Sequence, residues 1–255
     1  MKEEKKFSCS DWMEGMPSIS SVLKGIEKET NNRRILRVLY DEQKEKQKKA
    51  ELGFLRAKAN EWDFSVQATT SDMIDQHTLG NTHGGIIAEC TPRDIPLLSL
   101  DSIKDSGVYF MLEGVEDPYN FGYAVRSLFA AGIDGVIIPP RNWMGVAGIV
   151  ARSSAGASEQ IPLFQAEGAE GIKIFQKKGY RVICAGIRDS VSLFDADLSR
   201  PLLVVLGGEK RGISRVLLDM ADQTVRIDYG SSFNGSLSTS AAAAVFAFEI
   251  LRFNR

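Results

Sequence analysis

The chain has 255 residues, of which 44% are hydrophobic and 25% charged, and its formal net charge at pH 7 is −2. These values are typical of a globular protein and argue against intrinsic disorder. The longest apolar run, residues 241–248, is too short to cross a membrane, and the N-terminus lacks the apolar core of a signal peptide. Cys9, Cys90 and Cys184 are widely spaced and form no CxxC motif, which favours reduced thiols and predicts no metal site. We therefore expect a cytoplasmic protein.

The charge is unevenly distributed along the chain. Residues 1–60 contain 14 Lys and Arg against 10 Asp and Glu, whereas the remainder contains 17 against 23. A basic N-terminal region fits contacts with a phosphate backbone, although solvated helix faces explain it equally well. The candidate RNA-binding residues are Arg33, Arg34, Arg37 and His83. A lone histidine before a strand, such as His83, is more often a hydrogen-bonded turn residue.

Residues 1–17 are expected to form a tail, and residues 18–90 a small α/β domain. Hydrophobic periodicity and turn residues identify the elements of this domain. In chain order we predict a helix over 19–26, a strand over 34–40, a long charged helix from Asp41 to about Ala59, a strand over 64–66, a short helix from Ser71 and a strand over 82–88.

Residues 91–104 contain two prolines and no periodicity, and are interpreted as a linker to a second domain over 105–255. In this domain we predict strands over 108–112, 135–138, 160–164, 180–185, 202–206 and 224–227, and helices ending at Ala131 and over 147–155, 168–178, 214–221 and 240–252. Such alternation predicts a mostly parallel sheet with helices on both faces. In the last helix, Val245, Phe248 and Leu251 form the expected buried stripe, and its alanines suit a contact within the chain or with a partner subunit.

The stretch from Leu202 to Glu249 carries the strongest local signal for a ligand site. An apolar run ends at Gly207 and Gly208, and ligands of open α/β sheets bind at the carboxyl ends of strands. The glycine spacing resembles a phosphate-binding loop, but Ile213 stands where that loop requires lysine. The loop alone is equally compatible with an ordinary strand–turn–helix junction.

Three motifs of the second domain carry a specific resemblance. They are Asn120-x-Gly122-x-x-x-Arg126, Leu206-Gly207-Gly208-Glu209-x-x-Gly212-Ile213-Ser214, and Ser236-Leu237-Ser238-Thr239-Ser240 followed by 241–249. In this order and spacing they resemble the SpoU/TrmH family of SPOUT-class RNA 2′-O-ribose methyltransferases. Residues 151–157 resemble the family's small-residue helix. The segment 82–86 resembles part of the ribosomal-protein-like substrate-binding domain of many members.

The resemblance implies a trefoil knot in the C-terminal half, S-adenosylmethionine as the cofactor and a homodimer with the active site at its interface. It places Arg126, Asn120, Glu209 and Ser238 at the catalytic centre. The residues that match the cofactor loops are Leu206, Gly207, Gly208, Ile213, Ile227, Ser236 and Leu237.

Methyl transfer from a sulfonium to a ribose hydroxyl requires alignment, removal of a proton and stabilisation of a developing alkoxide. Because arginine is almost never neutral, we interpret Arg126 as a cation that lowers the hydroxyl pKa or holds a phosphate. The alternative is an ion pair of Arg126 with Glu113 or Asp117. Asn120 could instead cap its helix, and Glu209 could orient Arg126 or Asn120 by a hydrogen bond.

The third motif departs from the family. Ser238 stands where the family has asparagine, Asp228 stands where proline is common, and the loop 229–235 is about one residue longer. Serine is shorter than asparagine, so its hydrogen bond must move or pass through water, unless Asn234 substitutes. We therefore expect altered geometry on the substrate side of the site.

The predicted function is methyl transfer from S-adenosylmethionine to a ribose 2′-hydroxyl of structured RNA, with ribosomal RNA preferred. The alternatives are a tRNA 2′-O-methyltransferase, a base methyltransferase and a catalytically silent RNA-binding or ribosome-assembly protein that retains the fold.

Overall fold

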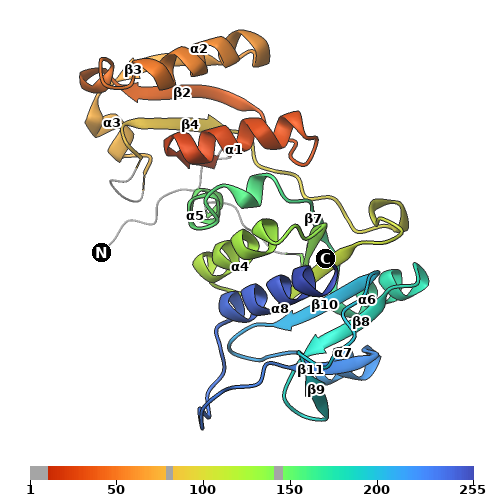
Figure 1. The fold of residues 1–255 in the computed structure, drawn as a ribbon. Helices are drawn as coiled ribbons and strands as arrows, with labels where there is room; N and C mark the ends of the chain where they lie inside the picture. The colour runs from red at the N-terminus through yellow and green to blue at the C-terminus, as the bar shows by residue number, and fades with distance from the viewer. Residues whose placement is uncertain (1–10, 79–82, 141–145) are drawn as a thin grey trace. The chain divides into compact units, whose positions relative to one another are not determined.

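The computed structural model describes residues 11–78, 83–140 and 146–255. Two compact units make up the chain, and Figure 1 shows their elements. The first unit comprises Met1–Asp94 and Asn142–Gln160, and the second comprises Ile95–Arg141 and Ile161–Arg255. Within the described residues, no helix combines the length and the apolar character that a membrane crossing requires.

The first unit contains a four-stranded sheet in the order β1-β4-β2-β3. Its elements are β1 (Asp11–Glu14), α1 (Gly15–Glu27), β2 (Ile35–Asp41), η1 (Glu42–Lys44), α2 (Lys49–Trp62), β3 (Ser65–Thr69), α3 (Ser71–Asp75), β4 (Ile86–Cys90), α5 (Ala147–Ser153) and η3 (Ala157–Glu159). Strand β4 is antiparallel to β1 and β2, whereas β2 and β3 are parallel. Apolar side chains of α1, α2 and the sheet form one core cluster.

The boundaries of this unit differ from the expected division in two places. Residues 11–17, expected to belong to a tail, form β1 and the start of α1, because Met13 is fully buried and β1 pairs with β4. Residues 146–160, expected to belong to the second domain, pack with the first unit through α5 and η3. A Cβ atom built on Gly25 of α1 would overlap the backbone of Glu159, so only glycine allows this close approach.

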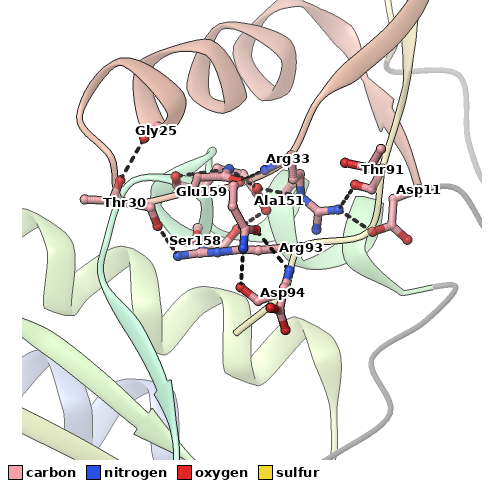
Figure 2. A network of polar contacts seen from close by, with 12 residues as sticks. Asp11, Gly25, Thr30, Arg33, Thr91, Arg93, Asp94, Ala151, Ser158 and Glu159 are labelled. Atoms are coloured by element: carbon pink, nitrogen blue, oxygen red, sulfur yellow. Dashed lines mark hydrogen bonds and ion pairs between the residues drawn. The ribbon is translucent and has the colours of Figure 1, made fainter. Parts of the chain in front are cut away.

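A buried polar network joins these segments, and Figure 2 shows it from close by. The Arg33 guanidinium contacts the carboxylates of Asp11 and Glu159, and Glu159 also accepts a hydrogen bond from Asn31 at 2.6 Å. The Arg93 guanidinium donates to the backbone oxygens of Thr30 and Ser158. Burial favours the neutral acid, but the charges of Arg33 and Arg93 outweigh it and hold the Glu159 pKa below its usual range.

The second unit contains a seven-stranded sheet in the order β7-β6-β5-β10-β8-β11-β9, in which every pairing is parallel. Its elements are η2 (Leu100–Ser102), β5 (Val108–Glu113), α4 (Pro118–Ala130), β6 (Gly135–Ile138), β7 (Leu163–Gln165), α6 (Gly168–Lys177), β8 (Arg181–Ala185), β9 (Ser190–Ser192), β10 (Leu202–Gly207), α7 (Arg215–Met220), β11 (Gln223–Arg226) and α8 (Thr239–Phe253). Helices α6 and α7 share a core cluster with β5, β8 and β10, and α4 packs along α8. The mostly parallel sheet is thus confirmed, while the trefoil knot stays a prediction.

Three details of the predicted elements are wrong. Asp41 caps the short η1 turn by accepting from the Gln43 N–H, and the α-helix that follows begins only at Lys49. Strand β9 lies in a stretch in which no strand was predicted. In α8 the buried positions include Ala243, Phe246, Ala247 and Ile250, whereas Phe248 is 49% exposed.

The network predicts a large stability loss for Glu159→Gln. The substitution removes a buried carboxylate and leaves the Arg33 guanidinium partly uncompensated, which is expected to cost about 3–5 kcal/mol. Urea unfolding, followed by a probe in the first unit, measures the difference in free energy.

The matched control is Glu61→Gln in the same unit, because Glu61 pairs with Lys58 at the surface. This exposed pair is expected to contribute far less than the buried network, because solvent screens it. Equal effects of the two substitutions would contradict the role given to the network.

Candidate functional site

The carboxyl ends of the central strands of the second unit surround a cavity of about 760 Å³. Its walls are the segment 185–188 after β8, the segment 206–213 at the end of β10 and the segment 225–237, which includes the loop after β11. All seven residues predicted to bind a cofactor line this cavity: Leu206, Gly207, Gly208, Ile213, Ile227, Ser236 and Leu237. The cavity lies where parallel sheets bind ligands, and its volume is within the range of about 300–1,000 Å³ found for small-molecule sites.

The loop after β10 is held by backbone contacts that only a glycine permits. Gly208 pairs with Gly212 across the turn, and the Gly212 N–H donates to the Gly208 carbonyl at 2.9 Å. A Cβ atom on Gly208 would overlap the carbonyl of Gly114, which follows β5. The absence of a side chain at position 208 therefore brings the ends of β10 and β5 together.

A second cavity, of about 460 Å³, adjoins the first. The two share Glu209 and Thr239 in their linings, and the second also includes Asp117 and Asn120. The Asn120 Nδ2 donates to the Glu209 Oε1 at 2.7 Å, which confirms the hydrogen bond considered from the sequence. The first and second motifs thus meet at the boundary of the two cavities.

Asn120 lies in the first turn of α4, and Asp117 caps this helix. The Asp117 carboxylate accepts from the backbone N–H groups of Tyr119 and Asn120 at 2.7 and 2.9 Å. The capping role considered for Asn120 therefore belongs to Asp117, which leaves the Asn120 side chain for Glu209.

Arg126 lies six residues beyond Asn120 on α4 and is exposed. Among the described residues it makes no ion pair or hydrogen bond, so the considered pair with Glu113 or Asp117 is absent there. Six residues correspond to a rotation of about 240° at 3.6 residues per turn, so Arg126 and Asn120 lie on different sides of α4. The structure does not bring Arg126 to the Asn120–Glu209 pair within one chain.

Ser238 caps α8 and is exposed to solvent. Its hydroxyl accepts from the Ala241 N–H at 3.2 Å and lies 3.0 Å from the Ser240 hydroxyl. The neighbouring Thr239 is buried and donates to the Gly207 carbonyl at 2.9 Å, which ties α8 to the loop after β10.

Several residues of the larger cavity were not among the predicted site residues. They are Ile187, Arg188, Tyr229, Phe233 and Thr239, and Asn234 also lies in this lining. The Tyr229 hydroxyl accepts from the Leu237 N–H at 3.2 Å, and its ring centroid lies 5.5 Å from that of Phe233. Thr239 belongs to the third motif and could have been selected with it. The other residues lie in loops without a distinctive pattern.

Asp228, which stands in place of the family's proline, forms part of the cavity wall. It accepts from the Arg226 Nε at 2.7 Å. Hydrogen bonds from Ser192 and Arg226 hold the Asp228 pKa below its usual range, so this carboxylate is charged at neutral pH.

The candidate RNA-binding residues of the first unit have different surroundings. Arg33 is only 5% exposed and is paired with two carboxylates, so its guanidinium is not available to a phosphate and we remove it from the candidates. His83 is 6% exposed, and its Nδ1 accepts from the Gly85 N–H at 3.1 Å, as expected for a turn residue. Arg34 is exposed, and Arg37 pairs with Glu89 at 2.6 Å while its guanidinium lies over the Trp12 ring.

The larger cavity fits an adenosine-containing cofactor better than a metal ion. Leu206, Ile213 and Ile227 offer apolar surface for a ring, and the glycine-rich loop after β10 places backbone groups beside them. Within the described part of the chain, no group of three His, Cys, Asp or Glu side chains could hold a metal ion.

Comparisons with known proteins agree with this geometry. Residues 107–248 match the model of the SpoU rRNA Methylase family. The 23S rRNA (guanosine-2'-O-)-methyltransferase RlmB of Shewanella oneidensis is 31% identical over 202 residues, which cover 77% of this chain and 82% of the relative. A tRNA/rRNA methyltransferase of Mycobacterium avium, described as uncharacterized, is 34% identical over 187 residues, or 71% of this chain and 60% of that protein.

A solved structure shows the same fold. The AdoMet-bound rRNA methyltransferase of Sinorhizobium meliloti superposes with a TM-score of 0.78 at 21% identity and covers 96% of this chain and 87% of the other. The family model covers more than half of the residues, and residues from each of the three motifs line the two adjoining cavities. The chain therefore belongs to the SpoU rRNA methylase family.

Proposed function

We propose that this protein transfers a methyl group from S-adenosylmethionine to a ribose 2′-hydroxyl of ribosomal RNA, as a homodimer in the cytoplasm. The observation that best supports this proposal is the hydrogen bond between Asn120 and Glu209, which joins the first and second motifs. It lies at the edge of the cavity that is lined by all seven residues predicted to bind the cofactor. Membership of the SpoU family and the 23S rRNA methyltransferase among the relatives support the reaction and the substrate.

The larger cavity is the proposed cofactor site. S-adenosylmethionine supplies an electrophilic methyl group when it is bound. Leu206, Ile213 and Ile227 provide an apolar environment for the adenine, and the backbone of the loop after β10 provides hydrogen-bonding groups for it. The Thr239–Gly207 hydrogen bond holds this loop in place and reduces the cost of ordering it on binding.

Asn120 and Glu209 are the proposed groups at the ribose. One N–H of the Asn120 side-chain amide donates to Glu209, so the other N–H and the amide oxygen can form hydrogen bonds with a hydroxyl. Glu209 has a second carboxylate oxygen that can accept the hydroxyl proton or orient the ribose. The fixed pair supplies positioning without reorganisation during the reaction.

Arg126 is the proposed cation that lowers the pKa of the 2′-hydroxyl or holds the adjacent phosphate. It lies on one stripe of α4 with Tyr119 and Tyr123, which are 42% and 48% exposed. On α8, which packs along α4, Phe248 is also exposed. Exposed aromatic side chains beside an arginine without a partner among the described residues suit an interface, and we propose that Arg126 serves the site of the partner subunit.

The second candidate is a catalytically silent RNA-binding protein. It is favoured by Ser238, which replaces the family's asparagine and whose hydroxyl caps α8. A tRNA substrate is the alternative within the enzymatic class, supported by the tRNA/rRNA methyltransferase among the relatives.

The first prediction from the proposed function concerns the substrate. Mapping of 2′-O-methyl positions in cellular RNA, with and without this protein, is expected to show a ribosomal position that disappears when the protein is absent. Arg126→Ala is expected to abolish that methylation without weakening calorimetric binding of S-adenosylmethionine, since Arg126 does not line the larger cavity. A lost position in tRNA supports the alternative substrate, and an unchanged map supports the silent protein.

The second prediction concerns the Asn120–Glu209 pair. Asn120→Asp places two carboxylates side by side and is expected to lower the rate of methyl transfer by about 10²-fold, with little change in cofactor affinity. Single-turnover methylation of the mapped RNA, together with calorimetry, separates the two effects. The control is Lys173→Ala, an exposed position on α6. Full activity of Asn120→Asp would remove the pair from the mechanism.

The third prediction concerns the homodimer. Arg126→Ala and Glu209→Ala are each expected to be inactive alone. Random reassociation of equal amounts is expected to restore about one quarter of the wild-type rate, because half of the dimers regain one complete site. Sedimentation velocity confirms the dimer before mixing. If the mixture stays inactive while heterodimers form, Arg126 acts within its own chain.

A further inference from the structure

The larger cavity contains one charged side chain whose role is unassigned. Its charged lining residues are Arg188, Glu209, Arg226 and Asp228. Glu209 is bonded by Asn120, and Arg226 is paired with Asp228. Arg188 is exposed and, within the described ranges, forms no hydrogen bond or ion pair. Among the described residues that line the cavity, Arg188 therefore presents the one guanidinium without a partner.

The turn that carries Arg188 is anchored on both sides. The Gly186 N–H donates to the Val225 carbonyl at 3.0 Å, so the turn is attached to β11. The Ser190 hydroxyl donates to the Ile187 carbonyl at 2.6 Å and closes the turn before β9. The backbone at Arg188 is thus fixed at the cavity wall, while its long side chain can move to a ligand.

The cofactor in the proposed function has a charged end that suits this wall. The methionine portion of S-adenosylmethionine carries an α-carboxylate and an α-ammonium group. A guanidinium can bind a carboxylate through two parallel hydrogen bonds, which gives both strength and geometric selection. Glu209 and Asp228 supply negative charge in the same lining, so the cavity offers groups of both signs to a zwitterion.

We propose that Arg188 binds the α-carboxylate of the methionine portion of S-adenosylmethionine and thereby selects the complete cofactor over adenosine compounds that lack this group. The inference rests on the proposed function, because it assumes that this cofactor occupies the cavity. It assigns a ligand contact to a residue outside the three motifs.

Calorimetry with two ligands tests this contact. S-adenosylmethionine and decarboxylated S-adenosylmethionine differ only in the carboxylate. Wild-type protein is expected to bind the complete cofactor more tightly. Arg188→Ala is expected to weaken its binding by about tenfold or more, the size of a lost charge-assisted contact, while binding of the decarboxylated compound changes little. Discrimination between the two ligands is therefore expected to collapse in the variant.

Two further variants serve as controls. Arg188→Lys keeps the charge but loses the planar fork, and is expected to retain part of the discrimination. Arg215→Ala removes an exposed arginine that pairs with Asp219 outside the cavity, and is expected to bind both ligands as wild type does. Thermal unfolding of each variant reports whether the fold is retained.

Each other outcome has a distinct meaning. Unchanged affinities in Arg188→Ala, or an equal loss for both ligands, would overturn the assignment to the carboxylate and leave the proposed function intact. Intact cofactor binding with weakened binding of the substrate RNA would assign Arg188 to a phosphate and equally overturn it. If wild-type protein binds neither ligand, the proposed function itself fails.

Discussion

The backbone contact between Gly208 and Gly114 is the constraint on which the site depends. These residues follow the neighbouring parallel strands β10 and β5, and a side chain on Gly208 would overlap the Gly114 carbonyl. Because the two strand ends meet so closely, Glu209 lies within hydrogen-bonding distance of Asn120 in the first turn of α4. The Asp117 cap fixes the start of that helix, so both partners of the pair are held by backbone geometry. A glycine at one strand end thus determines where a carboxylate and an amide meet.

The two halves of the site are supported in different ways. The larger cavity is built from segments of one unit, and hydrogen bonds such as Thr239 to Gly207 and Leu237 to Tyr229 connect its walls. Arg126, in contrast, lies on an exposed stripe of α4 without a partner among the described residues. A cation left in solvent is well suited to a phosphate or to a neighbouring subunit, and a poor candidate for stabilising its own fold. Because the cofactor cavity and Arg126 are supported so differently, cofactor binding and methyl transfer are best measured separately.

The sequence predicted which residues line the larger cavity better than it predicted the boundaries of the units. Strand ends marked by glycine are visible in a sequence, and every residue assigned to the cofactor loops lines the cavity. A buried arginine has no such mark, so the sequence places Arg33 with surface residues, whereas in the structure it pairs with Asp11 and Glu159. The phase of α8 could not be read because 241–244 are all alanine, which fits any face of a helix, and packing against α4 decided it. The placement of 146–160 depends on contacts distant in sequence, which no local pattern reports.

The altered third motif changes the site on one side only. Serine and asparagine are both good N-caps, so Ser238 keeps the capping function at α8, as its bond to the Ala241 N–H demonstrates. The serine side chain is shorter than that of asparagine and has no amide group, so it cannot extend past the cap to a further hydrogen-bond partner. The neighbouring residues Ser236 and Leu237 still line the larger cavity, together with Phe233 and Asn234 from the longer loop. The serine at 238 and the longer loop therefore leave the proposed cofactor side of the site in place. They alter the side on which the RNA would approach. We therefore expect this protein to differ from its relatives in how it recognises its substrate.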